Sequence, residues 1–424
     1  MFKWGFRSNL KIHGADEPKS AQLQLKDSKD TISLSKLIRE KLPVIDTSKK
    51  LWLNPFLFNG TLQTLYYTSH DSSKKFLVYY GREIFQYNDG GICSLDWVIP
   101  KPESKEEFDK LYKETLPEDS PRLHPRSRFF TKEELSIKKQ GSTEETSPIL
   151  VILHGLGGGS HEPLIRNLVE KFKEDSKSKD WDILVINSRG CCRTKITTGK
   201  LFTSFATDDI KEVLVELKKR YPNRPIYTAG LSFGSILNAN LLGSQDPEVK
   251  KLIKASALVG CAWDLHDSAY HIDASWTGSY LFNPSLVKFL NKIVKNNFKE
   301  LNSADPKIFS KESLQESKSH TKTWQFDSLY TCRTAGYDNA FDYYRDASPV
   351  RRLRYIDVPT LAINSTDDPA VSCRIPWMEA ENNSYVNILE TDLGGHLGYV
   401  QYSGEFWCTQ VIHDYLTEFE KLIQ

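Results

Sequence analysis

The sequence has no excess of charge of either sign. Its 424 residues include 56 basic and 55 acidic side chains, for a formal net charge of +1. Such a balance provides no field that would steer the protein to nucleic acid, and no nucleic-acid-binding motif is present. No run of about 18 apolar residues occurs either, so we expect no membrane-spanning helix.

The basic N-terminus lacks the continuous apolar core of a secretory signal. It carries three aromatic side chains, Phe2, Trp4 and Phe6. We expect a solvated or docked N-terminal arm, and peripheral contact with a membrane surface or a lipid droplet is the alternative interpretation.

Cysteine is scattered through the chain and odd in number. Of the seven residues, Cys191 and Cys192 are adjacent, whereas Cys373 and Cys408 stand alone. An odd and scattered set does not suit a disulfide framework, and the spacing of a zinc site is missing. We therefore expect a reducing, intracellular compartment. We also expect no bound metal or other cofactor, because the groups predicted below can supply the chemistry that a metal would.

A turn at 230–234 has the pattern G-x-S-x-G, with Ser232 at its centre. It follows a short apolar strand and precedes a helix of small residues, in the stretch PIYTAGLSFGSILNANLL. A serine on such a turn needs a strained backbone, and its neighbours two residues away must lack side chains. The helix also points its N-terminus at the place where negative charge develops. The pattern predicts that Ser232 is a nucleophile.

A serine nucleophile needs an adjacent base and a group that orients the base. The predicted strand PTLAINS ends before Asp367 and Asp368, and the next predicted strand, YVNILET, ends before His396. Serine, acid and histidine thus follow in the order typical of a strand–turn–helix nucleophile fold. We choose Asp368 over Asp367 as the acid, because it stands directly before Pro369.

A glycine-rich turn at 155–159 follows the predicted buried strand PILVILHG. We expect the backbone N–H groups of Leu156 and Phe233 to form an oxyanion hole, since the anion of a tetrahedral intermediate needs preset donors. No Gly-Lys-Ser/Thr follows, and no G-x-G-x-x-G opens a helix, which argues against phosphate-loop and dinucleotide-binding interpretations. For His154 we expect a structural hydrogen bond, and for His161 a helix-capping role.

The chain divides into two regions that differ in composition and in the pattern of expected strands and helices. Residues 1–146 read as an N-terminal extension that holds the first antiparallel strands, including a hairpin turned at 88–91, and a charged surface loop at 101–146 with one short helix. In 147–424, buried strands alternate with helices, which predicts an α/β fold with a mostly parallel sheet covered by helices on both faces.

An insertion at about 261–346 interrupts this alternation and is expected to cover the nucleophile as a lid. Its aromatic residues are Trp263, Tyr270, Trp276, Tyr280, Phe282 and Phe289. They suit contact with an acyl chain, because they bury large apolar areas. The alternative is that they pack the lid onto the body.

The chain resembles the type-4 family of the AB hydrolase superfamily in motifs from nearly its whole length. These are HGLGGGSHEP, NSRGCCRTKITT, GLSFGS, NSTDDP and DLGGHLGY, with NGTLQTLYY and GREIFQYNDGG upstream. Within that family it is similar to the fungal medium-chain fatty acid ethyl ester synthase/esterases, also called alcohol O-acyltransferases. A sister branch with the same motifs includes a fungal monoacylglycerol lipase.

The resemblance implies an α/β-hydrolase fold and a triad of Ser232, Asp368 and His396. The implied activity transfers a medium-chain acyl group from its coenzyme A thioester to ethanol and hydrolyses the resulting esters, with association at a lipid droplet or the mitochondrial outer surface. The alternatives are a monoacylglycerol lipase or general carboxylester hydrolase and, from another class, a non-catalytic hydrolase-fold protein that binds lipid surfaces.

Overall fold

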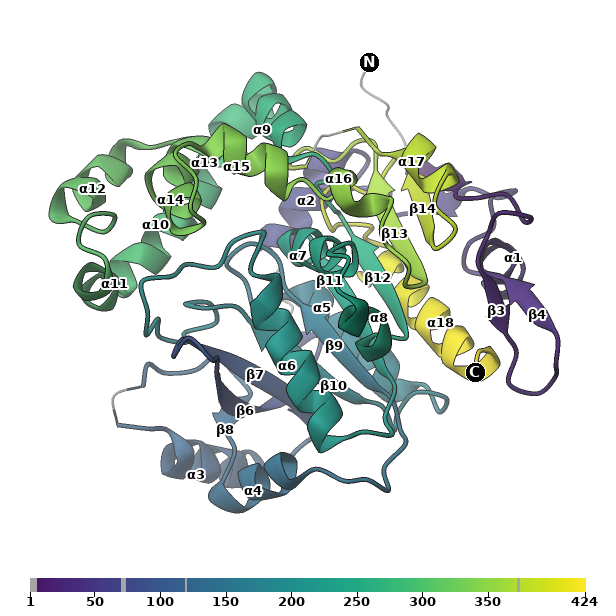
Figure 1. Ribbon diagram of the computed structural model, residues 1–424, viewed down its shortest axis with the longest axis horizontal. Helices are drawn as coiled ribbons and strands as arrows, with labels where there is room; N and C mark the ends of the chain where they lie inside the picture. The colour runs from purple at the N-terminus through teal and green to yellow at the C-terminus, as the bar shows by residue number, and fades with distance from the viewer. Residues whose placement is uncertain (1–5, 70–73, 119, 372–373) are drawn as a thin grey trace.

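Strands that are buried on both faces lie at the centre of the molecule (Figure 1). The computed structural model describes residues 6–69, 74–118, 120–371 and 374–424, so Phe2, Trp4 and Cys373 lie outside the described residues. Within these ranges the main sheet has ten strands in the order β2-β14-β13-β12-β11-β9-β10-β7-β6-β8. They are β2 (Leu10–His13), β6 (Tyr79–Gln86), β7 (Ile92–Ile99), β8 (Ser127–Phe129), β9 (Ile149–Leu153), β10 (Asp182–Asn187), β11 (Ile226–Leu231), β12 (Ala255–Val259), β13 (Thr360–Ser365) and β14 (Val386–Thr391).

Neighbouring strands are parallel from β14 to β10, as the buried apolar runs predict. Helices α5 (Pro163–Glu174) and α18 (Trp407–Leu422) share one hydrophobic core with one face of the sheet. Helices α6 (Thr207–Arg220), α7 (Phe233–Leu242) and α8 (Pro247–Leu252) share a second core with the other face. The molecule therefore has three layers, and the carboxyl ends of the parallel strands lie at one edge.

The N-terminal extension completes the sheet at both of its edges. Strand β2 pairs antiparallel with β14, and the predicted hairpin of β6 and β7 pairs antiparallel with β10. Two small antiparallel pairs accompany these strands: β1 (Arg7–Ser8) pairs with β5 (Leu51–Trp52), and β3 (Gln22–Gln24) pairs with β4 (Thr31–Ser33). The extension also contains helices α1 (Leu34–Lys41) and α2 (Gly60–Ser69). The extension is thus built into the body of the protein.

The charged stretch 101–146 is more ordered than its composition predicts. The expectation of a surface loop with one short helix is wrong, because the stretch contains helices α3 (Lys105–Thr115) and α4 (Lys132–Gln140) and the sheet strand β8. A capping box between Thr131 and Glu134 starts α4, and Arg128 donates two hydrogen bonds of 2.6 Å to the Glu134 carboxylate. Local caps and a few buried side chains, such as Phe108, order a segment most of whose charges face solvent.

The predicted lid lies between β12 and β13 and gathers at one end of the sheet (Figure 1, green). Its helices are α9 (Leu265–Ala274), α10 (Asn283–Asn296), α11 (Phe298–Ala304), α12 (Lys311–Glu316), α13 (Thr323–Phe326), α14 (Cys332–Thr334) and α15 (Ala340–Ala347), with π-helical turns η2 (Gly278–Phe282) and η4 (Asp327–Thr331) and a 3-10 turn η3 (Ser317–Ser319). Helix α16 (Val350–Leu353) leads into β13, and α17 (Trp377–Glu381) precedes β14. Among the helices of the described residues, none has both the length and the apolar character that crossing a bilayer requires.

Candidate active site

Ser232 stands on the sharp turn between strand β11 and helix α7. Its backbone adopts φ 53° and ψ −116°, a left-handed conformation that L-residues rarely take. A Cβ atom on Gly230 would lie 2.6 Å from the carbonyl oxygen of Gly234, and one on Gly234 would lie 2.2 Å from that of Leu153. Both glycines are therefore required for the turn, which places the serine at the N-terminal end of α7.

The three side chains predicted as a triad form one chain of hydrogen bonds. Ser232 Oγ lies 2.7 Å from His396 Nε2, and His396 Nδ1 lies 2.8 Å from Asp368 Oδ2. The other carboxylate oxygen of Asp368 accepts hydrogen bonds from the N–H groups of Ala370 and Val371, at 2.9 and 2.8 Å. Asp368 is buried, so its position is fixed, and the imidazole can donate from Nδ1 while Nε2 accepts the serine proton.

The neighbouring carboxylate, Asp367, has different partners. Its Oδ1 accepts hydrogen bonds from the Ser365 hydroxyl and from the N–H groups of Gly394 and Gly395, at 2.7, 3.0 and 2.9 Å. Burial raises the pKa of this carboxyl group. Asp367 thus holds the loop that carries the histidine, and Asp368 is the acid that contacts the imidazole.

A threonine from the N-terminal extension holds the backbone of the histidine in place. Thr64, on helix α2, accepts a 2.8 Å hydrogen bond from the His396 backbone N–H and donates one of 2.7 Å to the carbonyl of Gly60. We did not predict this contact, which joins positions 332 residues apart. The only sequence signal was that Thr64 belongs to the NGTLQTLYY motif.

The two proposed oxyanion donors border the same cavity as the serine. Leu156 lies in the glycine turn after β9, and a Cβ atom on the preceding Gly155 would be 3.5 Å from Ser232 Cβ. Phe233 is the first residue of α7. Within the part of the chain that the structure describes, neither backbone N–H donates a hydrogen bond. Both donors are therefore available to a ligand beside Ser232.

Two histidines near this turn can be compared with their predicted roles. His154 is hydrogen-bonded to the backbone at both ring nitrogens, as expected, and burial lowers its pKa to about 4. The helix-capping role predicted for His161 is wrong. The N-cap of α5 is Glu162, without a side-chain cap, and the His161 ring instead stacks on His124 at a centroid distance of 3.7 Å.

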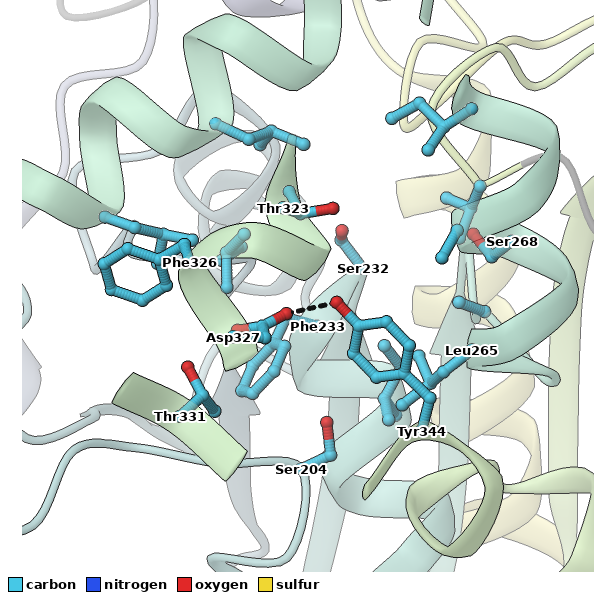
Figure 2. A pocket seen from close by; sticks show the side chains of 18 of the residues that line it. Ser204, Ser232, Phe233, Leu265, Ser268, Thr323, Phe326, Asp327, Thr331 and Tyr344 are labelled. Carbon is cyan, nitrogen blue, oxygen red and sulfur yellow. Dashed lines mark hydrogen bonds between the residues drawn. The ribbon is translucent and has the colours of Figure 1, made fainter. Parts of the chain in front are cut away.

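An apolar inner cavity of about 180 Å³ opens beside Ser232 beneath the lid (Figure 2). Helix α9 lines it with Leu265, Ser268, Ala269 and Ile272, and helix α10 with Leu286, Leu290, Ile293 and Val294. Both sets follow the spacing of one helix face. An aliphatic chain would therefore be surrounded largely by hydrocarbon.

One carboxyl group lies in this apolar surrounding. Asp327 of η4 accepts a hydrogen bond from the Tyr344 hydroxyl of α15, and the two side chains meet across the inner cavity (Figure 2). Burial raises the pKa of Asp327 to about 6. Sequence reasoning missed this pair, because neither residue belongs to a motif.

A second, outer cavity of about 620 Å³ meets the inner one at the serine. The two share Leu156, Ser232, Leu286 and His396. The outer cavity is bordered by the glycine turn, by the start of α5 and by Tyr67 and Thr68 of α2. Ser232 and His396 thus stand at the junction of an apolar compartment and a more open one.

The prediction that the named lid aromatics contact the acyl chain is wrong for the inner cavity. Trp263 packs into the core of the body, as the alternative predicted, and Phe282 is also buried. Tyr270, Trp276 and Tyr280 are instead 68%, 74% and 73% exposed. The aromatic side chains of the inner cavity are Phe202, Phe233, Phe326, Tyr343 and Tyr344. The reason is the amphipathic lid: on α9 the small and aliphatic side chains face inward and the aromatic ring faces outward.

Comparison with known proteins agrees with this fold. The family model for the alpha/beta hydrolase fold matches residues 148–401. The chain is 39% identical to medium-chain fatty acid ethyl ester synthase/esterase 2 of Saccharomyces cerevisiae, over 100% of this chain and 97% of that protein. It is 32% identical to the monoacylglycerol lipase of the same yeast, over 91% of this chain and 86% of the lipase.

These similarities confirm the resemblance stated from the motifs. The family model covers more than half of the chain, and the yeast synthase/esterase aligns from end to end. The two yeast relatives, by their names, are an ester synthase/esterase and a lipase. The chain belongs to the alpha/beta hydrolase family.

Proposed function

We propose that the protein is a serine acyltransferase and esterase. In this proposal it moves a medium-chain acyl group from a coenzyme A thioester to ethanol and also hydrolyses the resulting esters. The observation that carries the proposal is the chain of hydrogen bonds from Asp368 through His396 to Ser232, at the junction of the two cavities. The similarity to the yeast synthase/esterase supports the choice of substrates.

In the first step, Ser232 Oγ attacks the thioester carbonyl while its proton passes to His396 Nε2. Asp368 accepts the hydrogen bond from Nδ1, which keeps the imidazole in the correct tautomer and stabilises its charged form. The carbonyl oxygen becomes an anion that the N–H groups of Leu156 and Phe233 can stabilise. When the carbon–sulfur bond breaks, His396 returns the proton to the departing thiolate, and an acyl-serine remains.

In the second step, ethanol or water enters from the outer cavity. His396 takes a proton from the incoming oxygen as that oxygen attacks the acyl-serine, and then returns the proton to Ser232 Oγ. Ethanol yields an ethyl ester and water yields the free acid. Both steps use side chains and backbone donors of this chain alone, with coenzyme A only as part of the substrate.

The inner cavity fits the acyl group in this proposal. Each methylene that enters an apolar site gains about 0.8 kcal/mol. The cavity is small, at about 180 Å³, and Asp327 interrupts its apolar lining. The small volume and the polar interruption support an acyl chain of medium length.

The runner-up is a monoacylglycerol lipase or another carboxylester hydrolase, supported by the similarity to the yeast lipase. It would use the same serine, and water would replace ethanol. A non-catalytic lipid-surface protein is a distant alternative. The assembled hydrogen-bond chain argues against it, because a binding protein has no need of an oriented base beside a strained serine.

We also propose that the protein contacts a lipid surface peripherally, at a lipid droplet or the mitochondrial outer surface. This is supported by large rings exposed on the outer side of the lid that covers the inner cavity, which belong to Tyr270, Trp276 and Tyr280. Aromatic side chains with a polar atom favour the boundary between water and lipid.

The test is incubation of the purified protein with octanoyl-coenzyme A, with and without ethanol, beside Ser232→Ala. Removing such a serine should reduce turnover by about 10⁶. We expect ethyl octanoate only when ethanol and Ser232 are both present. Free octanoate alone would favour the hydrolase alternative, and undiminished turnover by Ser232→Ala would refute the proposed site.

A further inference from the structure

A third cavity, of about 580 Å³, adjoins the outer cavity of the active site. The two share His124, His161 and Phe289. Its walls are formed by the segment with Glu118, Ser120, Pro121 and His124, by the glycine turn with His161, by the loop after β10 and by helix α10. We call it the basic cavity, for the charges described next. A ligand can therefore extend from the serine through the outer cavity into this one.

Cations predominate among the charged residues of the basic cavity. Arg193 and Lys195 come from the loop after β10, and Lys292 comes from α10. Glu118 is the acidic residue of the lining. Within the described residues, none of the three cations forms an ion pair with a carboxylate. Among the described residues that line the cavity, three basic side chains thus face one acidic side chain.

The loop after β10 is held in a strained conformation. Cys192 and Arg193 have φ values of 49° and 63°, in the left-handed region. Arg82 donates a 2.9 Å hydrogen bond to the Cys192 carbonyl, and the Arg193 guanidinium donates to the carbonyls of Arg122 and Leu123. Strain that the surrounding structure maintains is characteristic of ligand sites. These contacts hold the backbone of the loop and the Arg193 guanidinium in place at the edge of the basic cavity.

Burial and the nearby cations both lower the pKa values of the two stacked histidines. Burial, with His161 and the guanidinium groups of Arg193, Arg82 and Arg166, lowers the pKa of His124 to about 3. Both rings are then neutral near pH 7, because burial also lowers the pKa of His161. The ring nitrogens and the cations offer hydrogen-bond donors to an anion.

The same two rings and Cys192 bring possible metal-binding atoms within 4.8 Å of one another. Their geometry does not suit a metal ion. The rings are parallel to within 4° at 3.7 Å, so their in-plane lone pairs do not converge on one point. The Arg82 guanidinium also lies 3.2 Å from Cys192 Sγ. The surroundings favour an anion.

Helix α10 separates two chemically different compartments. Leu286, Leu290 and Val294 line the inner cavity, whereas Phe289, Lys292 and Asn296 line the basic cavity. A substrate with an apolar tail and a charged head, joined at a carbonyl near Ser232, would match both sides of this helix. An acyl-coenzyme A has this arrangement.

We propose that the basic cavity binds the phosphate groups of the coenzyme A part of the substrate, while the pantetheine arm lies in the outer cavity. The inference rests on the proposed function. The distance is short: Gly155 lies beside Ser232 and Gly159 beside Cys192. Four residues span at most roughly 14 Å, which a pantetheine arm can bridge.

The test compares two substrates that share the octanoyl group, octanoyl-coenzyme A and p-nitrophenyl octanoate. The variants are Lys292→Glu and Lys195→Glu, with Lys295→Glu as the matched control on α10 that does not line these cavities. Each lining variant should raise KM for octanoyl-coenzyme A about tenfold, because a charge-assisted contact becomes repulsive. The KM for the nitrophenyl ester should stay within about twofold, as for an exposed charge.

Added salt should weaken octanoyl-coenzyme A binding in the unaltered protein and have little effect on the nitrophenyl ester. Coenzyme A should compete with the nitrophenyl ester more strongly than pantetheine, which has no phosphate. Both results would support the basic cavity as the phosphate site.

Equal loss on both substrates, or no difference between the lining variants and Lys295→Glu, would overturn the proposal. An unaltered protein that cleaves the nitrophenyl ester and not octanoyl-coenzyme A would also overturn it, while a serine hydrolase would remain. Failure to cleave either substrate would refute the proposed function itself, so the two failures are distinguishable.

Discussion

The carboxyl group of Asp327 costs the folded protein stability at neutral pH. Burial raises its pKa from 3.8 to about 6, so the folded protein holds a proton that the unfolded chain has lost between these pH values. The unfavourable contribution is complete above pH 6 and absent below pH 3.8. A pKa shift of about two units corresponds to about 3 kcal/mol.

Replacing Asp327 with asparagine should therefore stabilise the protein at pH 7 by up to about 3 kcal/mol. Asparagine keeps an oxygen that can accept the Tyr344 hydroxyl. The gain should shrink as the pH falls and should disappear near pH 4. Denaturant unfolding of both proteins at pH 7 and pH 4 measures the difference, provided that the slope of the transition is unchanged.

Tyr344→Phe provides a matched control. It removes the hydroxyl that donates to the ionised carboxylate, so it should destabilise the protein more at pH 7 than at pH 4. The reasoning is refuted if Asp327→Asn is less stable than the unaltered protein at pH 7. It is refuted equally if the difference between them is the same at both pH values.

Two further predictions concern the acid of the triad and the outer side of the lid. Asp368→Asn should lower kcat by about 10⁴, because the amide can stabilise the wrong tautomer of His396, whereas Asp367→Asn should lower it less; equal losses in a steady-state assay of p-nitrophenyl octanoate hydrolysis would contradict the assignment. Trp276→Ser should weaken binding to zwitterionic phospholipid vesicles in a sedimentation assay without changing hydrolysis of soluble p-nitrophenyl esters, and unchanged sedimentation would argue against lipid contact through the lid.

The elements of the candidate active site could be predicted from the sequence because their signals are local. Around Ser232, the glycines, the apolar strand and the helix lie within 18 consecutive residues, and each is a direct steric requirement of the turn. The order of Asp368 and His396 after two buried strands follows from the parallel sheet, whose carboxyl ends meet at one edge. Hydrophobic runs buried on both faces were enough to predict that sheet.

Contacts between distant segments needed the tertiary structure. Thr64 supports His396 from 332 positions away, and no local pattern encodes that contact. The stretch 101–146 is ordered by caps and by a strand that pairs with β6, although its composition indicates a loop. Composition reports how many charges a segment has, but it does not report which of them its packing leaves at the surface.

In the lid, the sequence predicted one feature, and another needed the tertiary structure. Its position over the nucleophile followed from the interrupted alternation of strands and helices, but the direction of each side chain did not. Tyr270 and Trp276 face solvent, while Asp327 and Tyr344 meet at the inner cavity. The sequence by itself determined the sheet, the turn and the order of the triad, since local sterics and periodicity encode them. The tertiary structure alone decided which lid residues line the cavities, because that depends on how short helices rotate and pack against one another.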